Sequence, residues 1–443
     1  NLRQLRATLA RGFSCVVASA QPSERGLTMR VLMLAVVTAN AAAFLRPRPL
    51  LSRHMRALAA TVPSLERAES VNAAQLITEH PMNNISPAIV ERVGRSLHRT
   101  PNHPLNIIKK RIEGYFVERA KKDGVEFEVF DDLAPVVKIT QNFDDLLIPE
   151  DHVSRSPSDT YYINDELMLR GHTSAHQATL LQNGFDNFLC SGDVYRRDEI
   201  DASHYPVFHQ MEGVRVFPHL EPAAGSDPVQ GNKEVEADLK DALEGMVDAV
   251  FGPVEKRWID AYFPFTEPSF ELEIFYNDEW LEVLGCGVMQ QDILRKAGRG
   301  EQPGWAFGLG LERLAMVLFD VPDIRLFWSN DERFIKQFKD GEITKFKSFS
   351  KYPACYKDVS FWIDEETPFH PNDLAEIVRG VGGDLVEEVK LIDEFTHPKT
   401  GKTSNAFRIN YRSMERSLTN EEVNEMQDRV RDQLVDAFKV ELR

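Results

Sequence analysis

Three stretches of this sequence combine charged, polar and glycine residues in patterns suited to binding a phosphorylated substrate. The first, YRRDEIDASHYPVFHQME, spans residues 195–212, with an arginine near its start and a carboxylate at its end. Two strands joined by a loop can hold Arg196 against a phosphate and aim Glu212 at an amine on the same side of a sheet. Taken alone, Arg196 is equally well explained as half of a surface ion pair.

The second stretch is GWAFGLGLERLAMVLFD, residues 304–320. Gly308 and Gly310 would let the backbone approach a ligand closely. A helix that begins after them would offer its N-terminus to an anion, with Arg313 in its first turn. A dinucleotide-binding fingerprint is excluded, because no third glycine follows at the required spacing.

The third stretch is RGHTSAHQ, residues 170–177, which places Ser174, His176 and Gln177 in one polar group where a helix is predicted to begin. Thr173 or Ser174 could equally serve only as the N-cap of that helix. A catalytic serine–histidine pair is disfavoured, because no nucleophile-elbow glycine pattern surrounds Ser174.

The elements that must position these stretches follow from the spacing of apolar residues. A helix from about residue 100 is capped by Asn102 or His103, has Pro104 in its first turn and ends at Gly124. Several of the segments 126–132, 187–197, 207–217 and 279–289 alternate apolar and polar residues, as half-buried antiparallel strands do. Strands and helices do not alternate one for one. This favours an α+β fold, an antiparallel sheet flanked by helices, over a doubly wound parallel sheet.

The second half of the chain suggests a separate small domain. Residues 219–232 are predicted to form a surface insertion, 233–251 a helix, and 321–350 a connector of mixed charge. Beyond the connector the predicted order is strand (354–363), helix (372–380), strand (385–395), strand (405–412), helix (419–438) and short strand (439–443). This βαββαβ order is that of the ferredoxin-like fold.

Composition narrows the class of protein. A chain of 443 residues with 42% apolar and 27% charged residues is typical of a soluble protein of two or three domains. The four cysteines lie far apart, which argues against a disulfide framework or a structural zinc site and leaves any metal ligands unknown. No apolar run reaches the roughly 18 residues that span a bilayer, so no membrane protein is expected.

Charge is distributed unevenly. Residues 1–65 hold nine arginines and one acid, whereas the remaining residues carry a net charge of −25 within the total of −17. A body this acidic cannot bind nucleic acid by bulk charge, so any RNA contact must use local basic patches. The acid-poor start predicts an organellar targeting segment over residues 1–65. An apolar stretch at 31–37 followed by small residues also resembles a signal-plus-transit leader, so the mitochondrial matrix and the plastid stroma both remain open.

The first two stretches, with the helix predicted from residue 100, resemble the motifs of a class II aminoacyl-tRNA synthetase. The arginine–acid start with His204, Phe208 and Glu212 resembles its second motif, GLGLER its third, and HPLNIIKKRIEGYF (103–116) its first. TSAHQ, YFPFTEPSFELE (262–273), WLEVLGCGV (280–288) and IRLFW (324–328) resemble the phenylalanyl-tRNA synthetase family, of the monomeric organellar kind. The stretches KYPACYKDVSFWI, GGDLVEEVKLIDEF and HPKTGKTSNAFRINYRSMERSLTNEEV resemble its C-terminal anticodon-binding domain.

The resemblance implies a catalytic domain at 75–345, a ferredoxin-fold anticodon-binding domain at 351–443, and a monomer. It implies phenylalanine, ATP with Mg²⁺, and an organellar tRNA for phenylalanine as substrates, and no editing domain. Arg196 would grip the α-phosphate, Arg313 would lie near the γ-phosphate, and Phe208 would stack on adenine. Glu282 would face Mg²⁺ or the nucleotide, since Mg²⁺ prefers oxygen ligands.

The resemblance also implies which residues hold the amino acid and the tRNA. Those expected around the amino acid are Ser174, Ala175, His176, Gln177, Gln210, Met211 and Glu212. Ser203, His204 and Tyr205 would meet ATP and the tRNA acceptor end. Lys399, Lys402, Arg412 and Arg416 would contact the anticodon arm.

The side-chain pocket has its own physical argument. Phe263 and Phe265 flank a proline, so two rings lie at a stiff turn where an aromatic ligand could pack against them. Phe307 would line the far side of the pocket. With 27 phenylalanines in the chain, all three could instead be core residues.

Two other functions are weighed against phenylalanine–tRNA ligation. One is a non-catalytic RNA-binding paralogue, which the joint presence of Arg196, Glu212 and Arg313 argues against. The other is a class II synthetase of different specificity, which the paired phenylalanines and the anticodon domain disfavour.

Overall fold

The structure is a computed structural model, and it describes residues 64–218, 228–348, 352–363 and 369–443. The predicted targeting segment therefore lies outside the described residues, apart from its last two, and so does most of the predicted insertion. No helix among the described residues is long and apolar enough to cross a membrane.

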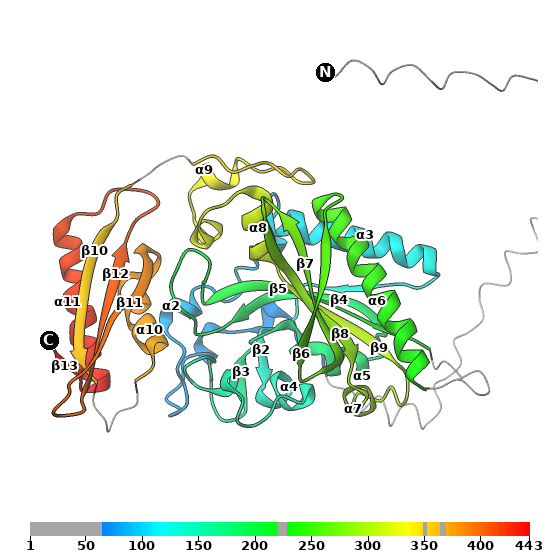
Figure 1. Ribbon diagram of the computed structural model, residues 1–443, viewed down its shortest axis with the longest axis horizontal. Helices are drawn as coiled ribbons and strands as arrows, with labels where there is room; N and C mark the ends of the chain where they lie inside the picture. The colour runs from blue at the N-terminus through cyan, green and yellow to red at the C-terminus, as the bar shows by residue number, and fades with distance from the viewer. Residues whose placement is uncertain (1–63, 219–227, 349–351, 364–368) are drawn as a thin grey trace, which may run out of the picture. The chain divides into compact units, whose positions relative to one another are not determined.

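A seven-stranded sheet forms the centre of the larger domain (Figure 1). Its strand order is β1-β4-β5-β9-β8-β7-β6, in which β1 runs parallel to β4 and every other neighbouring pair is antiparallel. The strands are β1 (Glu128–Phe130), β4 (Asn187–Tyr195), β5 (Val207–Val216), β6 (Lys256–Phe263), β7 (Thr266–Tyr276), β8 (Glu279–Met289) and β9 (Gly304–Gly310). The predicted antiparallel sheet is thus confirmed.

Three helices pack together over one face of this sheet: α3 (Pro104–Asp123), α6 (Pro228–Phe251) and α8 (Leu311–Phe319). The α3 helix begins and ends where the sequence predicts. The His103 side chain accepts a hydrogen bond from the Leu105 amide at 3.3 Å, and Gly124 ends the helix with a φ of 69°. Its buried stripe of Leu105, Ile108, Ile112 and Phe116 joins the main hydrophobic core.

Shorter elements surround the sheet. They are the strands β2 (Val136–Lys138) and β3 (Leu167–Leu169), and the helices α2 (Pro87–Val90), α4 (Ile139–Asn142), α5 (Gln177–Gln182), α7 (Gln291–Lys296) and α9 (Glu332–Ile335). Short 3₁₀ helices occur at 68–70, 73–75, 97–99, 144–146, 153–155, 173–176, 324–328 and 383–385.

Residues 321–350 were predicted to be a connector, but most of those described pack as part of the larger domain. Phe327, Trp328, Phe334 and Phe338 are all buried in the main core. Charged residues lie between Trp328 and Phe334 and between Phe334 and Phe338, and they conceal the buried side of this segment in the sequence.

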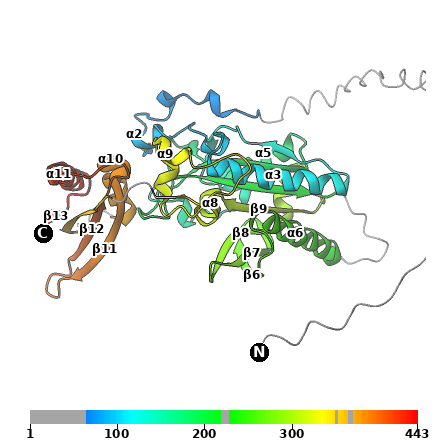
Figure 2. The same cartoon turned by 90° about the horizontal axis from the view of Figure 1, so that it is seen from above.

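The C-terminal residues form a second sheet of order β11-β12-β10-β13. Its strands are β10 (Cys355–Trp362), β11 (Val386–Thr396), β12 (Thr403–Tyr411) and β13 (Glu441–Leu442), and its helices are α10 (Pro371–Gly382) and α11 (Asn420–Phe438). The two helices pack against each other on one face, as Figure 2 shows. The chain order βαββαβ confirms the predicted ferredoxin-like fold.

Candidate active site

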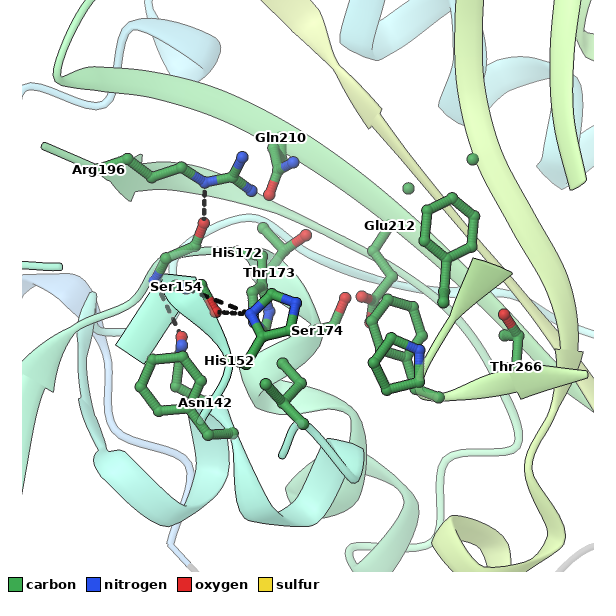
Figure 3. A pocket seen from close by; sticks show the side chains of 18 of the residues that line it. Asn142, His152, Ser154, His172, Thr173, Ser174, Arg196, Gln210, Glu212 and Thr266 are labelled. Atoms are coloured by element: carbon green, nitrogen blue, oxygen red, sulfur yellow. Dashed lines mark hydrogen bonds between the residues drawn. The ribbon is translucent and has the colours of Figure 1, made fainter. Parts of the chain in front are cut away.

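A cavity of about 620 Å³ lies at the seven-stranded sheet, bordered by β5, β7, β8 and β9 and by the segment from residue 142 to 177. Successive side chains of a strand point to opposite faces, so along β5 Gln210 and Glu212 face the cavity while His209 and Met211 face the core. Figure 3 shows Arg196, Gln210 and Glu212 along one wall, with Ser174 pointing toward Glu212. Pockets of this size hold small-molecule substrates.

Two aromatic rings line the part of the cavity next to the turn between β6 and β7. The rings of Phe263 and Phe265 are nearly parallel, with centroids 5.8 Å apart and planes 10° apart. Gly285 on β8 makes room for them, because a Cβ there would stand 2.7 Å from Cζ of Phe263. This geometry creates an apolar slot suited to a flat aromatic group.

Phe307 borders the cavity, but its ring points to the other side of the sheet. It stacks on Phe116 of α3 with centroids 5.4 Å apart, and it lies over Gly213, where a Cβ would come within 2.1 Å of Cε1. The cavity-facing residues of β9 are instead Ala306 and Gly308. Phe307 therefore packs mainly as a core residue.

Glu212 is the most unusual group in the cavity. It is 1% exposed, and neither carboxylate oxygen makes a hydrogen bond of normal geometry. Burial raises its pKa to about 8, and the nearby side chains of Ser174 and Gln177 offset only part of this rise. Ser174 and Gln177 are both neutral and do not balance the negative charge of a buried carboxylate, so the position of Glu212 favours a cationic ligand group in the cavity.

Arg196 lies at the end of β4 and is held from both sides. Its Nε donates to the carbonyl of Gly171 at 2.8 Å, and its guanidinium lies over the Phe208 ring at 5.2 Å. Asn142 holds the same glycine, since its Oδ1 accepts from the Gly171 amide at 2.9 Å. Arg196 is an exposed residue, so its guanidinium remains accessible at the edge of the cavity. The contacts with Gly171 and Phe208 therefore hold this positively charged group in place beside the cavity.

Another positive group, Arg313, lies in the first turn of α8. Its Nη1 is 3.0 Å from Oε2 of Glu282 on β8, and its side chain is about half exposed. A Cβ built at Gly308 or Gly310 meets nothing within 4 Å, so space for a ligand lies against this backbone. Such an arrangement suits a polyphosphate.

Comparison with known proteins agrees with this site. Residues 89–338 match the family described as tRNA synthetases class II core domain (F), and residues 350–443 match the ferredoxin-fold anticodon binding domain. The chain is 56% identical to the chloroplastic/mitochondrial phenylalanine–tRNA ligase of Arabidopsis thaliana over 82% of this chain and 84% of that one. It is 50% identical to the mitochondrial enzyme of Mus musculus over 81% and 86%, and 42% identical to that of Saccharomyces cerevisiae over 86% and 96%.

This chain belongs to the phenylalanine–tRNA ligase family. Within that family's class II core, nine of the residues expected at the site border the cavity: Ser174, Gln177, Arg196, Gln210, Glu212, Phe263, Phe265, Glu282 and Phe307.

Three residues expected around the amino acid instead pack behind the cavity. Ala175 and Met211 are core residues. His176 turns away from the cavity, and its Nε2 accepts from Nη1 of Arg170 at 2.8 Å. Burial, and next the Arg170 charge, lower the pKa of His176 well below its usual range.

In this 3₁₀ turn Thr173 and Ser174 border the cavity, as does Gln177 one turn after Ser174, whereas Ala175 and His176 do not.

The residues expected to meet ATP and the tRNA acceptor end, in the loop between β4 and β5, also differ in exposure. Ser203 and His204 are exposed, and both bind Asp201, with Nδ1 of His204 2.8 Å from its carboxylate. Partial burial opposes protonation, but Asp201 raises the pKa of His204 overall. Tyr205 is buried, stacks on Trp328 and accepts from Nε of Arg92 at 2.6 Å.

The four cations expected to contact tRNA lie at opposite ends of β12. Lys399 and Lys402 are exposed in the β11–β12 hairpin. Arg412 follows β12 and pairs with Glu387 at 3.1 Å, and Arg416 pairs with Glu422 at 2.8 Å. Nine strand residues separate the two groups by roughly 30 Å.

Several cavity residues were not predicted from the sequence, including Asn142, His152, His172 and Glu271. His172 lies inside the stretch RGHTSAHQ, two residues before Ser174, so the position of that stretch could have found it. Burial and the Arg196 charge lower its pKa to about 3, which keeps it neutral. Asn142 and His152 come from a segment that carries no motif.

Proposed function

We propose that this protein activates phenylalanine with ATP and transfers it to an organellar tRNA specific for phenylalanine. The observation that carries the proposal is the buried Glu212 carboxyl, which makes no hydrogen bond of normal geometry and borders the same cavity as the Phe263–Phe265 slot and Arg196. Phenylalanine has an ammonium for the carboxylate, a ring for the slot, and a carboxylate that can be directed toward the arginine.

The residues around the cavity then take the following roles. The phenylalanine ring packs against Phe263 and Phe265, and its ammonium pairs with Glu212. Ser174, Gln177 and Gln210 supply hydrogen bonds to the remaining polar atoms. Adenine stacks on the Phe208 ring, whose centroid lies 5.2 Å from Cζ of Arg196. The adenine ring is thereby placed close to the arginine assigned to the α-phosphate.

The chemistry requires positioning rather than a protein nucleophile. A carboxylate oxygen of phenylalanine attacks the α-phosphorus of ATP, a new O–P bond forms, and the bond to the β-phosphate breaks to release pyrophosphate. A ribose hydroxyl of the tRNA then attacks the carbonyl carbon, loses its proton, and displaces AMP. Arg196 stabilises the charge that develops on the α-phosphate, and Arg313 holds the terminal phosphates.

Class II synthetases use ATP as a substrate, typically with Mg²⁺, and the donor set here fits that ion. Glu271 and Glu282 lie on neighbouring strands and both border the cavity. Burial, followed by the charges of Glu282 and Glu273, raises the pKa of Glu271, so a nearby cation would relieve repulsion among the carboxylates. Oxygen ligands of this kind suit Mg²⁺ bound together with phosphates, where it neutralises phosphate charge.

The domain at 351–443 is proposed to read the anticodon. Lys399 and Lys402 are exposed in the hairpin, whereas Arg412 and Arg416 are each paired with a glutamate, so the two lysines are the better candidates for phosphate contact. Because one chain holds both the class II core and the anticodon-binding domain, we infer that it functions as a monomer. The arginine-rich start agrees with the organellar names of the relatives, so mitochondria, plastids or both are the proposed location.

The deciding experiment is ATP–pyrophosphate exchange with each amino acid in turn. Exchange that depends on phenylalanine supports the proposal. No exchange with any amino acid would indicate a non-catalytic paralogue, and exchange that depends on another amino acid would indicate a different specificity.

A further inference from the structure

A buried pair joins the two motifs assigned to ATP from behind the sheet. His209 on β5 is fully buried, and Glu312 on α8 is 2% exposed. Nδ1 of His209 lies 2.7 Å from Oε1 of Glu312, and the His209 backbone amide donates to Oε2 at 2.8 Å. One carboxylate therefore binds both the side chain and the main chain of the same residue.

The course of the chain explains this double contact. β5 pairs with β9 only as far as Gln210 opposite Gly310, and α8 begins at the next residue, Leu311. The Glu312 carboxylate thus accepts the hydrogen bond from His209 just past the end of β9. Hydrogen bonds to a carboxylate are stronger than neutral ones, and burial away from water strengthens them further.

The surroundings hold the imidazole in one orientation. The His209 ring stacks on Trp328, with centroids 5.7 Å and planes 27° apart, and it lies 5.0 Å from the His98 ring. Within the described residues Nε2 has no hydrogen-bond partner, so Glu312 is the polar group that fixes the ring.

We propose that His209 and Glu312 are positioning residues that set the geometry of the ATP site. Each is next in sequence to a residue assigned to ATP: Phe208 precedes His209, and Arg313 follows Glu312. Locking β5 to the first turn of α8 therefore fixes the adenine platform relative to the arginine at the terminal phosphates. This inference rests on the proposed function.

The pair should act more strongly on ATP than on phenylalanine, although Gln210, next to His209, also borders the cavity. The ring slot is built from the β6–β7 turn and from Gly285 on β8. The hydrogen bonds between His209 and Glu312 involve neither of these segments. A disturbed junction between β5 and α8 shifts Phe208 and Arg313 and leaves the slot in place. The expected signature is a much larger change in the KM for ATP than in the KM for phenylalanine.

The test measures both KM values by phenylalanine-dependent pyrophosphate exchange in full-length variants. Glu312→Gln replaces the carboxylate with a neutral amide, so both contacts with His209 lose the strength that the negative charge gives them. We expect the KM for ATP to rise roughly tenfold, as loss of about 1.4 kcal/mol implies. The KM for phenylalanine should stay within about twofold of the native value.

Glu113→Gln is the matched control, because Glu113 is a half-buried glutamate paired with Lys109 at 2.9 Å on α3. It should lower thermal stability without changing either KM. His209→Asn keeps a donor near the position of Nδ1 and should retain a nearly native KM for ATP, whereas His209→Leu should not.

The proposal is overturned if Glu312→Gln changes both KM values equally, or changes neither while it lowers stability as the control does. If Glu312→Gln does not fold, the comparison of His209→Asn with His209→Leu decides the matter. Equal KM values for ATP in those two variants would refute the positioning role. Absence of exchange in the native protein would refute the proposed function instead, so the two failures are distinguishable.

Discussion

Phenylalanine should bind more tightly as the pH rises from about 6 to about 8, because Glu212 must lose a proton first. Burial raises the pKa of Glu212 to about 8, so the carboxyl of the free protein is largely neutral near pH 7. An ammonium pairs with the carboxylate and not with the neutral acid. The ammonium of phenylalanine itself stays protonated over most of this range.

The size of the effect follows from the pKa. Roughly one Glu212 in a hundred is ionised near pH 6 and about half near pH 8, so the dissociation constant should fall roughly fiftyfold. Binding near pH 7 should release about nine-tenths of a proton to the buffer. In the free protein, this group favours the folded state below its ordinary pKa of 4.5. That contribution is lost as the pH rises through about 8.

Isothermal titration calorimetry without ATP, in two buffers of different ionisation enthalpy, measures both quantities. Glu212→Gln should bind phenylalanine weakly, with no pH dependence and no proton release. Glu282→Gln is the control, since Glu282 borders the same cavity but pairs with Arg313 at 3.0 Å. It should retain the native pH profile. A native dissociation constant that does not change with pH, or binding without proton release, would show that Glu212 is not the ammonium partner.

Three further outcomes are expected. Arg313→Ala should lose about 2.7–4 kcal/mol of transition-state stabilisation in exchange assays while tRNA binding barely changes, and a near-normal exchange rate would contradict its assignment. Deletion of residues 351–443 should abolish aminoacylation but spare phenylalanine-dependent exchange, and equal loss of both would mean that the domain is needed for folding. Tyrosine should be activated only about a hundredfold less efficiently than phenylalanine, because the rings of Phe263 and Phe265 offer no polar group to reject a hydroxyl. Preformed Tyr-tRNA should persist with enzyme present, and rapid enzyme-dependent hydrolysis would reveal an editing site.

The sequence predicted the elements whose signals are local. The α3 helix carries its own start at His103 and Pro104 and its own stop at Gly124, and both are found in the structure. The strands β4, β5 and β8 were predicted within two residues of their observed ends, because each is a long segment whose apolar and polar residues are typical of a strand. β9 was not predicted as a strand, because GWAFGLG combines glycines with apolar residues and shows no alternation.

The direction of side chains within a motif depends on tertiary packing, and motif membership does not supply it. His176 and Ser174 are two residues apart in one polar stretch, yet Ser174 borders the cavity and His176 binds Arg170. Phe307 precedes a glycine that faces the cavity, but its ring stacks on α3. The identity of a residue shows what chemistry it can do, and only the surrounding elements determine where that chemistry takes place.

The same reasoning explains why the buried residues behind this site are informative. When the functional residues of a strand lie on the face toward the cavity, the residues between them point to the opposite face of the sheet. His209 lies between Phe208 and Gln210, so it cannot reach the cavity, and an ordinary core position would favour an apolar side chain there. Instead it is a histidine bound twice to Glu312. Because burying two polar side chains is costly unless they are paired, this choice is best explained by the fixed geometry that the pair imposes on β5 and α8.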